Sequence, residues 1–275
     1  MNRLPYFRPT LSQSIVIALL LLAGSLIFGI LMSLVKLVVP TPMPECQSLA
    51  YIVMMSAPFI YIYLKAGKAR DAGEPFGKIN ERRFGSIGSA VWLALSTAAL
   101  LSLSVLIEPA TAFIPMSDGF KALFEKVFYE SPLWDSILST CILAPLCEEF
   151  LCRGMMLRGM LATETPRRAI VWSALLFALM HLNPWQSIPA FAIGLLFGWV
   201  YYRTGSLWLT IALHCINNSI STLLSRLIPD MGVDKGFIDL MPAVWYIVLY
   251  LFCLVLFIFA VRFLSKTKDE KTLSA

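Results

Sequence analysis

The residues of this chain best suited to chemistry are two glutamates and its only two histidines, all of which lie within apolar stretches. Glu148 and Glu149 are adjacent, and the histidines follow at His181 and His214. A carboxylate kept away from bulk water can act as a general base, and an imidazole beside it can share the water that the base activates. The second imidazole and the amide of Asn218 could donate hydrogen bonds to a developing oxyanion. These groups are the parts that hydrolysis of a peptide bond needs.

Helical spacing separates the roles of the two glutamates. Successive residues of an α-helix are about 100° apart, so Glu148 and Glu149 point in different directions. Glu149 and Arg153 are four residues apart with the glutamate nearer the N-terminus, which is the favourable order for an ion pair. We therefore expect Glu149 and Arg153 to pair and to hold their helix, and Glu148 to face a cavity.

Each histidine has a neighbour on the same helical face that could fix its ring. Phe177 precedes His181 by four residues, and Asn218 follows His214 by four. At a rise of about 1.5 Å per residue, Glu148, His181 and His214 lie ~15, ~20 and ~16 Å from basic residues that mark the inner surface. All three reach the middle of a bilayer about 30 Å thick, so they could meet. We predict a catalytic set of Glu148, His181, His214 and Asn218, supported by Glu149, Arg153 and Phe177.

The elements that carry these residues are predicted to be membrane helices. Of the 275 residues, 58% are hydrophobic and 14% are charged, whereas soluble domains carry about 25% charged residues. The apolar residues form blocks near the length of about 20 residues that crosses a bilayer as a helix. This pattern predicts an all-α polytopic protein of about eight transmembrane helices with a polar intramembrane cavity, a single domain over 1–275 and a catalytic core at 136–222. The predicted spans are 14–39, 47–66, 87–107, 133–157, 169–183, 187–202, 206–227 and 242–264.

The cations indicate a membrane topology rather than nucleic-acid binding, because they stand in short groups between the apolar blocks. With the N-terminus in the cytoplasm, 17 of the 22 Lys and Arg residues fall on the inner face and 5 on the outer face. That bias follows the positive-inside rule. We expect an integral, multi-pass protein of a bacterial cytoplasmic membrane with both termini in the cytoplasm. Residues 108–132 would lie outside, where apolar residues from Phe120 to Phe128 at helical spacing predict an amphipathic helix, either on the interface or packed on other helices.

Other interpretations of the polar cluster stay open. No cofactor is predicted, but Glu148, His181 and His214 could form a His₂Glu zinc site from separate helices, in which case the base would be another group such as Glu149. A transporter could use the cluster as a proton relay, although the inverted repeats typical of transporters are not clear here. A non-catalytic membrane scaffold or immunity-type protein would use it only to hold helices together.

The three polar segments resemble the motifs of the CAAX protease and bacteriocin-processing family, called CPBP or Abi, which includes the Ras-converting CAAX endopeptidases. The family pattern is EExxxR, then FxxxH, then HxxxN or HxxxD, and residues 148–153, 177–181 and 214–218 match it in order. The resemblance implies an eight-helix intramembrane endopeptidase of glutamate type. Glu148 would activate water with the help of His181, and His214 and Asn218 would form the oxyanion hole. The implied substrate is a membrane protein or peptide, lipidated or not.

Overall fold

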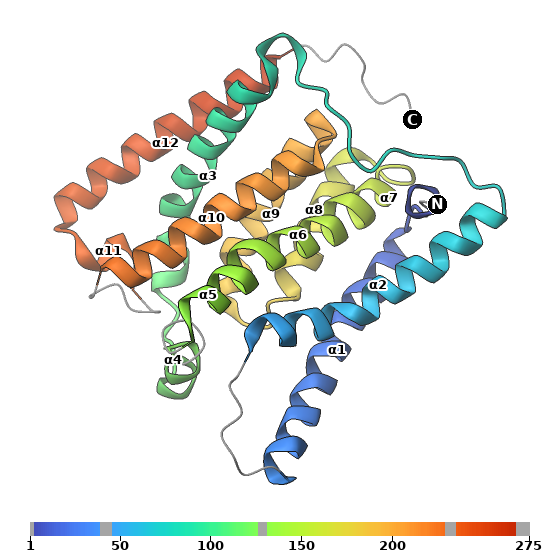
Figure 1. Cartoon of the computed structure of the whole chain (residues 1–275). Helices are drawn as coiled ribbons and strands as arrows, with labels where there is room; N and C mark the ends of the chain where they lie inside the picture. The colour runs from blue at the N-terminus through green and yellow to red at the C-terminus, as the bar shows by residue number, and fades with distance from the viewer. Residues whose placement is uncertain (1–2, 39–45, 126–130, 229–234, 268–275) are drawn as a thin grey trace.

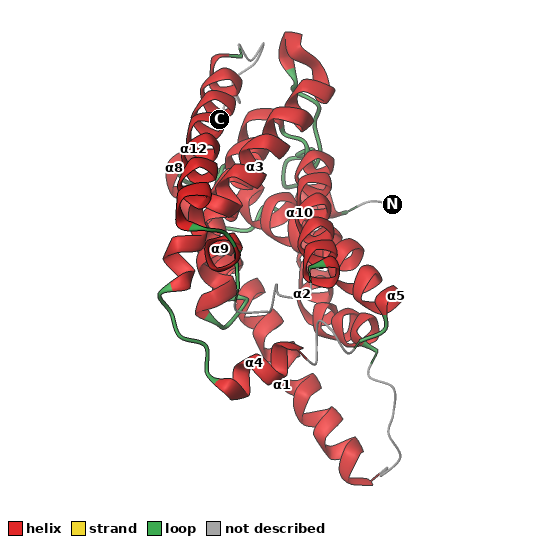
Figure 2. Ribbon diagram, turned by 90° about the vertical axis from the view of Figure 1, so that its left-hand side faces the viewer, coloured by secondary structure: helices red, strands yellow, loops and turns green. Residues whose placement is uncertain are grey.

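The computed structural model describes residues 3–38, 46–125, 131–228 and 235–267, and these residues form helices and connecting turns with no strand among them (Figure 2). The long helices are α1 (Leu11–Val38), α2 (Gln47–Asp71), α3 (Gly88–Ala112), α8 (Pro166–Leu179), α9 (Pro184–Thr204), α10 (Leu207–Leu227) and α12 (Ala243–Lys266). Shorter elements are η1 (Leu4–Tyr6), η2 (Gly85–Ile87), α4 (Asp118–Glu125) and α11 (Phe237–Leu240).

The helix that carries both glutamates is a succession of short α and π segments, which we call the composite helix (residues 133–160). Its parts are α5 (Leu133–Ser136), η4 (Ile137–Leu143), α6 (Ala144–Glu149), η5 (Phe150–Leu157) and α7 (Arg158–Met160). The segments η4 and η5 are π-helical, and at their ends Ala144 and Arg158 donate to carbonyls five residues back. Such wide turns are rare and are frequently found at functional sites. Both glutamates stand in the α-helical turns between them.

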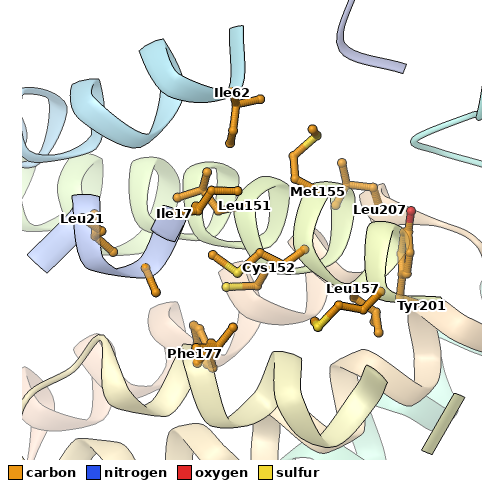
Figure 3. Close-up of a cluster of buried hydrophobic side chains, with 14 of the residues drawn as sticks. Ile17, Leu21, Ile62, Leu151, Cys152, Met155, Leu157, Phe177, Tyr201 and Leu207 are labelled. Carbon is orange, nitrogen blue, oxygen red and sulfur yellow. The ribbon is translucent and has the colours of Figure 1, made fainter. Parts of the chain in front are cut away.

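The composite helix, α8, α9 and α10 lie at the centre of the molecule, with the α1–α2 pair on one side and the α3–α12 pair on the other (Figure 1). The largest buried cluster joins the composite helix to α1, α2 and α8. Its members include Ile17, Ile62, Leu151, Met155 and Phe177 (Figure 3). This core fixes the face of the composite helix from which the site is built.

Each of the eight predicted spans coincides with a helix or with the composite helix over most of its length, but eight membrane crossings are not confirmed. Among the described residues, five helices are long and apolar enough to cross a bilayer: Leu11–Leu34, Gln47–Asp71, Gly85–Ala112, Leu207–Leu227 and Ala243–Lys266. The composite helix is divided into short segments, and α8 has only 14 residues. Large apolar side chains are exposed along α1 and α12, among them Leu26 at 67% and Val244 at 70%. Surfaces of this kind face lipid, and the chain is an integral membrane protein.

The turn between α8 and α9 changes the setting of His181. The fifth span was expected to run to residue 183, but α8 ends at Leu179 and His181 lies in the turn that follows. Leu182 adopts a positive φ of 57°, and the Asn183 side chain accepts a hydrogen bond from the Gln186 N–H at 2.9 Å, which caps α9. Proline at the next position suits the first turn of a helix. Residues 184–186, which lie between the fifth and sixth predicted spans, therefore form the first turn of α9.

Within 108–132, the described part of the predicted amphipathic helix is α4 (Asp118–Glu125). Helix α3 continues to Ala112, and the amphipathic part is α4, which begins at Asp118. The rings of Phe120 and Trp185 lie 5.2 Å apart, so α4 packs on the start of α9. The last residues of the predicted helix, 127 and 128, lie outside the described residues.

Candidate active site

Glu149 and Arg153 form the buried ion pair that their spacing predicted. Arg153 Nη1 donates to Glu149 Oε1 over 2.8 Å, and neither side chain is exposed. Arg153 Nη2 donates to the carbonyl of Gly194 in α9 at 3.0 Å. The guanidinium carbon also lies 4.8 Å from the ring centre of Phe177 and 5.5 Å from that of Phe197. A buried charge needs such compensation, and the pair thereby joins the composite helix to α8 and α9.

His214 of α10 joins this pair, a contact that helical spacing did not predict. Its Nδ1 lies 3.0 Å from Glu149 Oε1. Because an ionised carboxylate can only accept, Nδ1 must carry the proton of this hydrogen bond. The other ring nitrogen, Nε2, then faces Glu148 and lies 3.9 Å from its Oε2. The two glutamates therefore contact opposite sides of one imidazole.

Glu148 faces a narrow cavity, as its helical phase predicted, and His181 lines the same cavity. The cavity has a volume of about 60 Å³, which exceeds the roughly 10–15 Å³ that one water molecule needs. The Glu148 side chain is 17% exposed, so it is held mostly away from solvent. The other lining residues are Leu21, Ser25, Met54, Met55 and Met180.

The ring of His181 is oriented by its own preceding turn. Its Nδ1 lies 2.9 Å from the carbonyl oxygen of Phe177, and the Phe177 ring packs edge-on against it with centroids 5.0 Å apart. A carbonyl oxygen only accepts, so Nδ1 carries the proton and Nε2 keeps a lone pair. That lone pair can accept a hydrogen bond from a water molecule.

Asn218 lies one turn beyond His214 on α10 and is half-buried. Its Nδ2 donates to the carbonyl of Thr140 in the π-helical segment η4 at 2.9 Å. Its Oδ1 accepts from Nδ2 of Asn217 at 3.1 Å. An amide nitrogen has two hydrogens, so one donor of Asn218 is left after the bond to Thr140. Its place in an oxyanion hole stays a prediction.

Tyr51 of α2 also contacts the site, and the motifs could not predict it because α2 lies outside all three. Its hydroxyl donates to Glu148 Oε1 over 3.0 Å. The only hint in the sequence is the phenol itself, because a buried tyrosine hydroxyl usually needs a partner.

The zinc alternative, a His₂Glu site of Glu148, His181 and His214, stays a hypothesis. Among the described residues, no three His, Cys, Asp or Glu side chains gather closely enough to hold a metal ion. In the proposed His₂Glu set, Phe177 holds Nδ1 of His181 and Glu149 holds Nδ1 of His214, so Nε2 of each ring is the nitrogen left to contact a metal ion. Glu149 is itself paired with Arg153, so it is not free to serve as the substitute base.

Comparison with known proteins finds a similarity over the segment that carries this site. No curated protein and no solved structure shows a significant match to the chain. A family model does match at residues 130–220, a segment that contains all three motifs and runs from the composite helix into α10. Over that segment the chain is similar to the type II CAAX prenyl endopeptidase Rce1-like family, which confirms the resemblance carried by the Glu148, His181 and His214 motifs.

Proposed function

We propose that this chain is an intramembrane endopeptidase that hydrolyses peptide bonds of membrane-associated proteins or lipidated peptides, with a water molecule activated by Glu148. One observation carries the proposal: Glu148 and His181 line one narrow cavity, and Nε2 of His214 lies 3.9 Å from the same carboxylate. The matched family is described by its action on CAAX prenyl substrates. A prenylated peptide with a C-terminal CAAX sequence is therefore the first substrate to test.

The attacking water would be positioned by two acceptors. One of its hydrogens points to Glu148 and the other to the lone pair on Nε2 of His181, so an oxygen lone pair is directed at the scissile carbonyl carbon. As the C–O bond forms, Glu148 takes a proton from the water and the carbonyl electrons move onto its oxygen. Placing the water in this way removes much of the orientational barrier of the attack.

The developing oxyanion needs hydrogen-bond donors, which His214 and Asn218 would supply. His214 can donate from Nε2 when it is protonated, and Glu149 stabilises that cation through Nδ1. Asn218 would donate with the Nδ2 hydrogen that is not bound to Thr140. Glu148 then returns its proton to the leaving nitrogen as the C–N bond breaks, which gives a carboxylate and an amine.

The proposed setting is a bacterial cytoplasmic membrane with both termini in the cytoplasm. Eight crossings would require the composite helix, α8 and α9 to lie within the bilayer beside the five helices that are apolar enough to cross it. The 17 to 5 distribution of cations supports this topology.

The proposal is tested with the purified full-length chain in lipid nanodiscs. Wild-type protein and Glu148→Gln are incubated with a farnesylated CAAX peptide, its unlipidated counterpart and a set of single-span membrane peptides, and products are identified by mass spectrometry. We expect wild-type protein to cleave at least one of them at a defined bond. A wild-type protein that folds and cleaves none of these peptides favours the scaffold interpretation.

Metal chelators are expected to leave cleavage unchanged. The described residues do not assemble a three-donor site, and the proposed proton transfers use only protein groups. The measurement is the initial rate after prolonged dialysis against EDTA and 1,10-phenanthroline, together with the metal content of the same sample. Loss of activity that returns on addition of zinc contradicts a metal-free mechanism.

The variant His181→Ala is expected to lower kcat by roughly 10²-fold, the low end of the effect of a positioned acid or base. It removes one of the two acceptors that hold the water but leaves Glu148 in place. Rates are compared at equal amounts of folded protein, as judged by the thermal unfolding midpoint. A variant with the wild-type kcat would show that His181 does not orient the water.

A further inference from the structure

We propose that Tyr51 is a positioning residue for the general base and that Asp135 holds Tyr51 in place, so that α2 completes a site whose motifs all lie elsewhere in the chain. The Tyr51 hydroxyl donates to Oε1 of Glu148 at 3.0 Å. Tyr51 comes from α2, and Glu148 comes from the composite helix. The segment that matches the family begins at residue 130, so it does not include Tyr51.

The hydrogen bond from Tyr51 distinguishes the two carboxylate oxygens of Glu148. Oε1 is engaged by the phenol, whereas Oε2 lies 3.9 Å from Nε2 of His214. A carboxylate held at one oxygen cannot rotate freely about its terminal bond. Oε2 is therefore the oxygen that remains to receive a proton from water.

The start of α2 is capped by another helix rather than by its own sequence. Cys46, at the N-cap position, makes no side-chain cap hydrogen bond. Asp135, which is 1% exposed, accepts instead from the backbone N–H groups of Gln47 at 2.6 Å and Ser48 at 3.1 Å. The hydroxyl of Ser48 donates to the same carboxylate at 2.5 Å. The first N–H groups of a helix lack internal partners and carry partial positive charge, so a carboxylate stabilises that end.

The cap and the phenol act on the same turn of α2. Ser48 precedes Tyr51 by three residues, which is less than one helical turn. Asp135 and Glu148 belong to the same composite helix, so this helix holds α2 at both contacts. Further along α2, Phe59 stacks on Phe150 of the composite helix with ring centres 5.3 Å apart. Tyr51 therefore lies between two anchored points and cannot withdraw from Glu148 without breaking one of them.

The contact itself can be tested without any cleavage assay, by a double-mutant cycle on thermal unfolding in detergent micelles. Tyr51→Phe removes the hydroxyl, and Glu148→Leu removes its acceptor. We expect Tyr51→Phe to lower the unfolding midpoint in the wild-type background and to have no further effect in the Glu148→Leu background. Tyr63→Phe is the matched control, because Tyr63 is on the same helix and its ring contacts Arg3 at 4.5 Å instead. Equal effects of Tyr51→Phe in both backgrounds would overturn the proposed contact.

The effect of Tyr51 on catalysis rests on the proposed function and is measured by steady-state kinetics. Tyr51→Phe is expected to lower kcat by about tenfold to a hundredfold, the range for loss of a hydrogen bond to a charged group. KM should stay the same, because the phenol orients the base rather than the substrate. An unchanged kcat in a cleaving enzyme would overturn the positioning role.

Asp135→Asn is also expected to lower kcat. Combining it with Tyr51→Phe should add little to the loss of kcat caused by Tyr51→Phe alone. Glu108→Gln is the control, because Glu108 similarly accepts from two successive N–H groups, those of Phe237 and Ile238 at 3.3 and 3.2 Å. Those groups begin α11, away from Glu148, so this variant should keep the wild-type kcat. Additive losses for Asp135→Asn and Tyr51→Phe would show that Asp135 does not act through Tyr51.

The two kinds of measurement separate the two proposals. If the effect of Tyr51→Phe on the unfolding midpoint depends on Glu148, and Tyr51→Phe also lowers kcat, the proposed function and the role of Tyr51 are both supported. Coupled midpoints with no cleavage by the wild-type protein overturn the proposed function and leave the Tyr51–Glu148 contact supported. If the wild-type protein cleaves its substrate but Tyr51→Phe and Glu148→Leu shift the unfolding midpoint independently, the inference about Tyr51 is overturned and the peptidase proposal stays supported.

Discussion

Replacing Glu148 by glutamine is expected to lower kcat by about 10²–10⁴-fold, the range for removal of a general acid or base. Glutamine keeps the length of the side chain, and its amide oxygen can still accept the hydrogen bond from Tyr51. It cannot take a proton from water at neutral pH. The variant should therefore bind substrate with an unchanged Kd while its chemical step fails.

The measurement is single-turnover cleavage of the best substrate, together with the substrate affinity of the folded variant. Glu164→Gln is the matched control, because Glu164 lies outside the cavity and pairs with a partly exposed Arg168 at 3.2 Å. This control should keep wild-type activity, since pairs near the surface contribute little. Cleavage by Glu148→Gln within a few-fold of the wild-type rate would show that another group is the base.

Short-range spacing predicted the features of the site that lie on one helix. The i, i+4 relation predicted the ion pair of Glu149 with Arg153, and the 100° step between neighbours predicted that Glu148 would face elsewhere. Both follow from backbone geometry alone, and the structure confirms both. The contact of His181 with Phe177 is predictable for the same reason, although His181 stands just beyond the end of α8.

Contacts between helices could not be predicted from spacing. The bond from His214 to Glu149 and the bond from Tyr51 to Glu148 join residues 65 and 97 positions apart. Such pairs depend on which helices become neighbours, and that depends on the packing of many apolar side chains. Asp135 shows the same limit, because its place near the start of the predicted span 133–157 does not reveal that it is buried against the N-terminus of α2.

The apolar pattern identified where the helices are but not how each one meets lipid. Hydropathy responds to long apolar stretches, so it finds helices such as α1 and α12 readily. The composite helix carries charged and small polar residues, such as Glu149, Arg153 and Ser139, that bond to other groups of the protein, and its π turns leave no sequence signal of their own. For this reason the number of membrane crossings is less certain from the sequence than the presence of eight helical segments.

Replacing Arg153 by methionine is expected to destabilise the fold by about 3–5 kcal/mol, because it leaves the Glu149 carboxylate buried without its cation. The guanidinium also donates to Gly194 and lies against Phe177. All of these contacts would be lost together. We expect a lower yield of folded protein and a clear fall in the thermal unfolding midpoint in micelles. Arg168→Met, which breaks the partly exposed pair with Glu164, should change the midpoint little.

The double variant Glu149→Leu with Arg153→Met separates stability from positioning. Two apolar residues of similar volume remove both buried charges, and replacements of this kind are often neutral for stability. The fold should therefore recover relative to Arg153→Met. Catalysis should not recover, because His214 loses the acceptor that holds its Nδ1 and sets which nitrogen faces Glu148. A stable double variant with wild-type kcat would show that Glu149 serves only to neutralise Arg153. A double variant as unstable as Arg153→Met would show that the loss of stability comes mainly from packing around the guanidinium rather than from the unpaired charge.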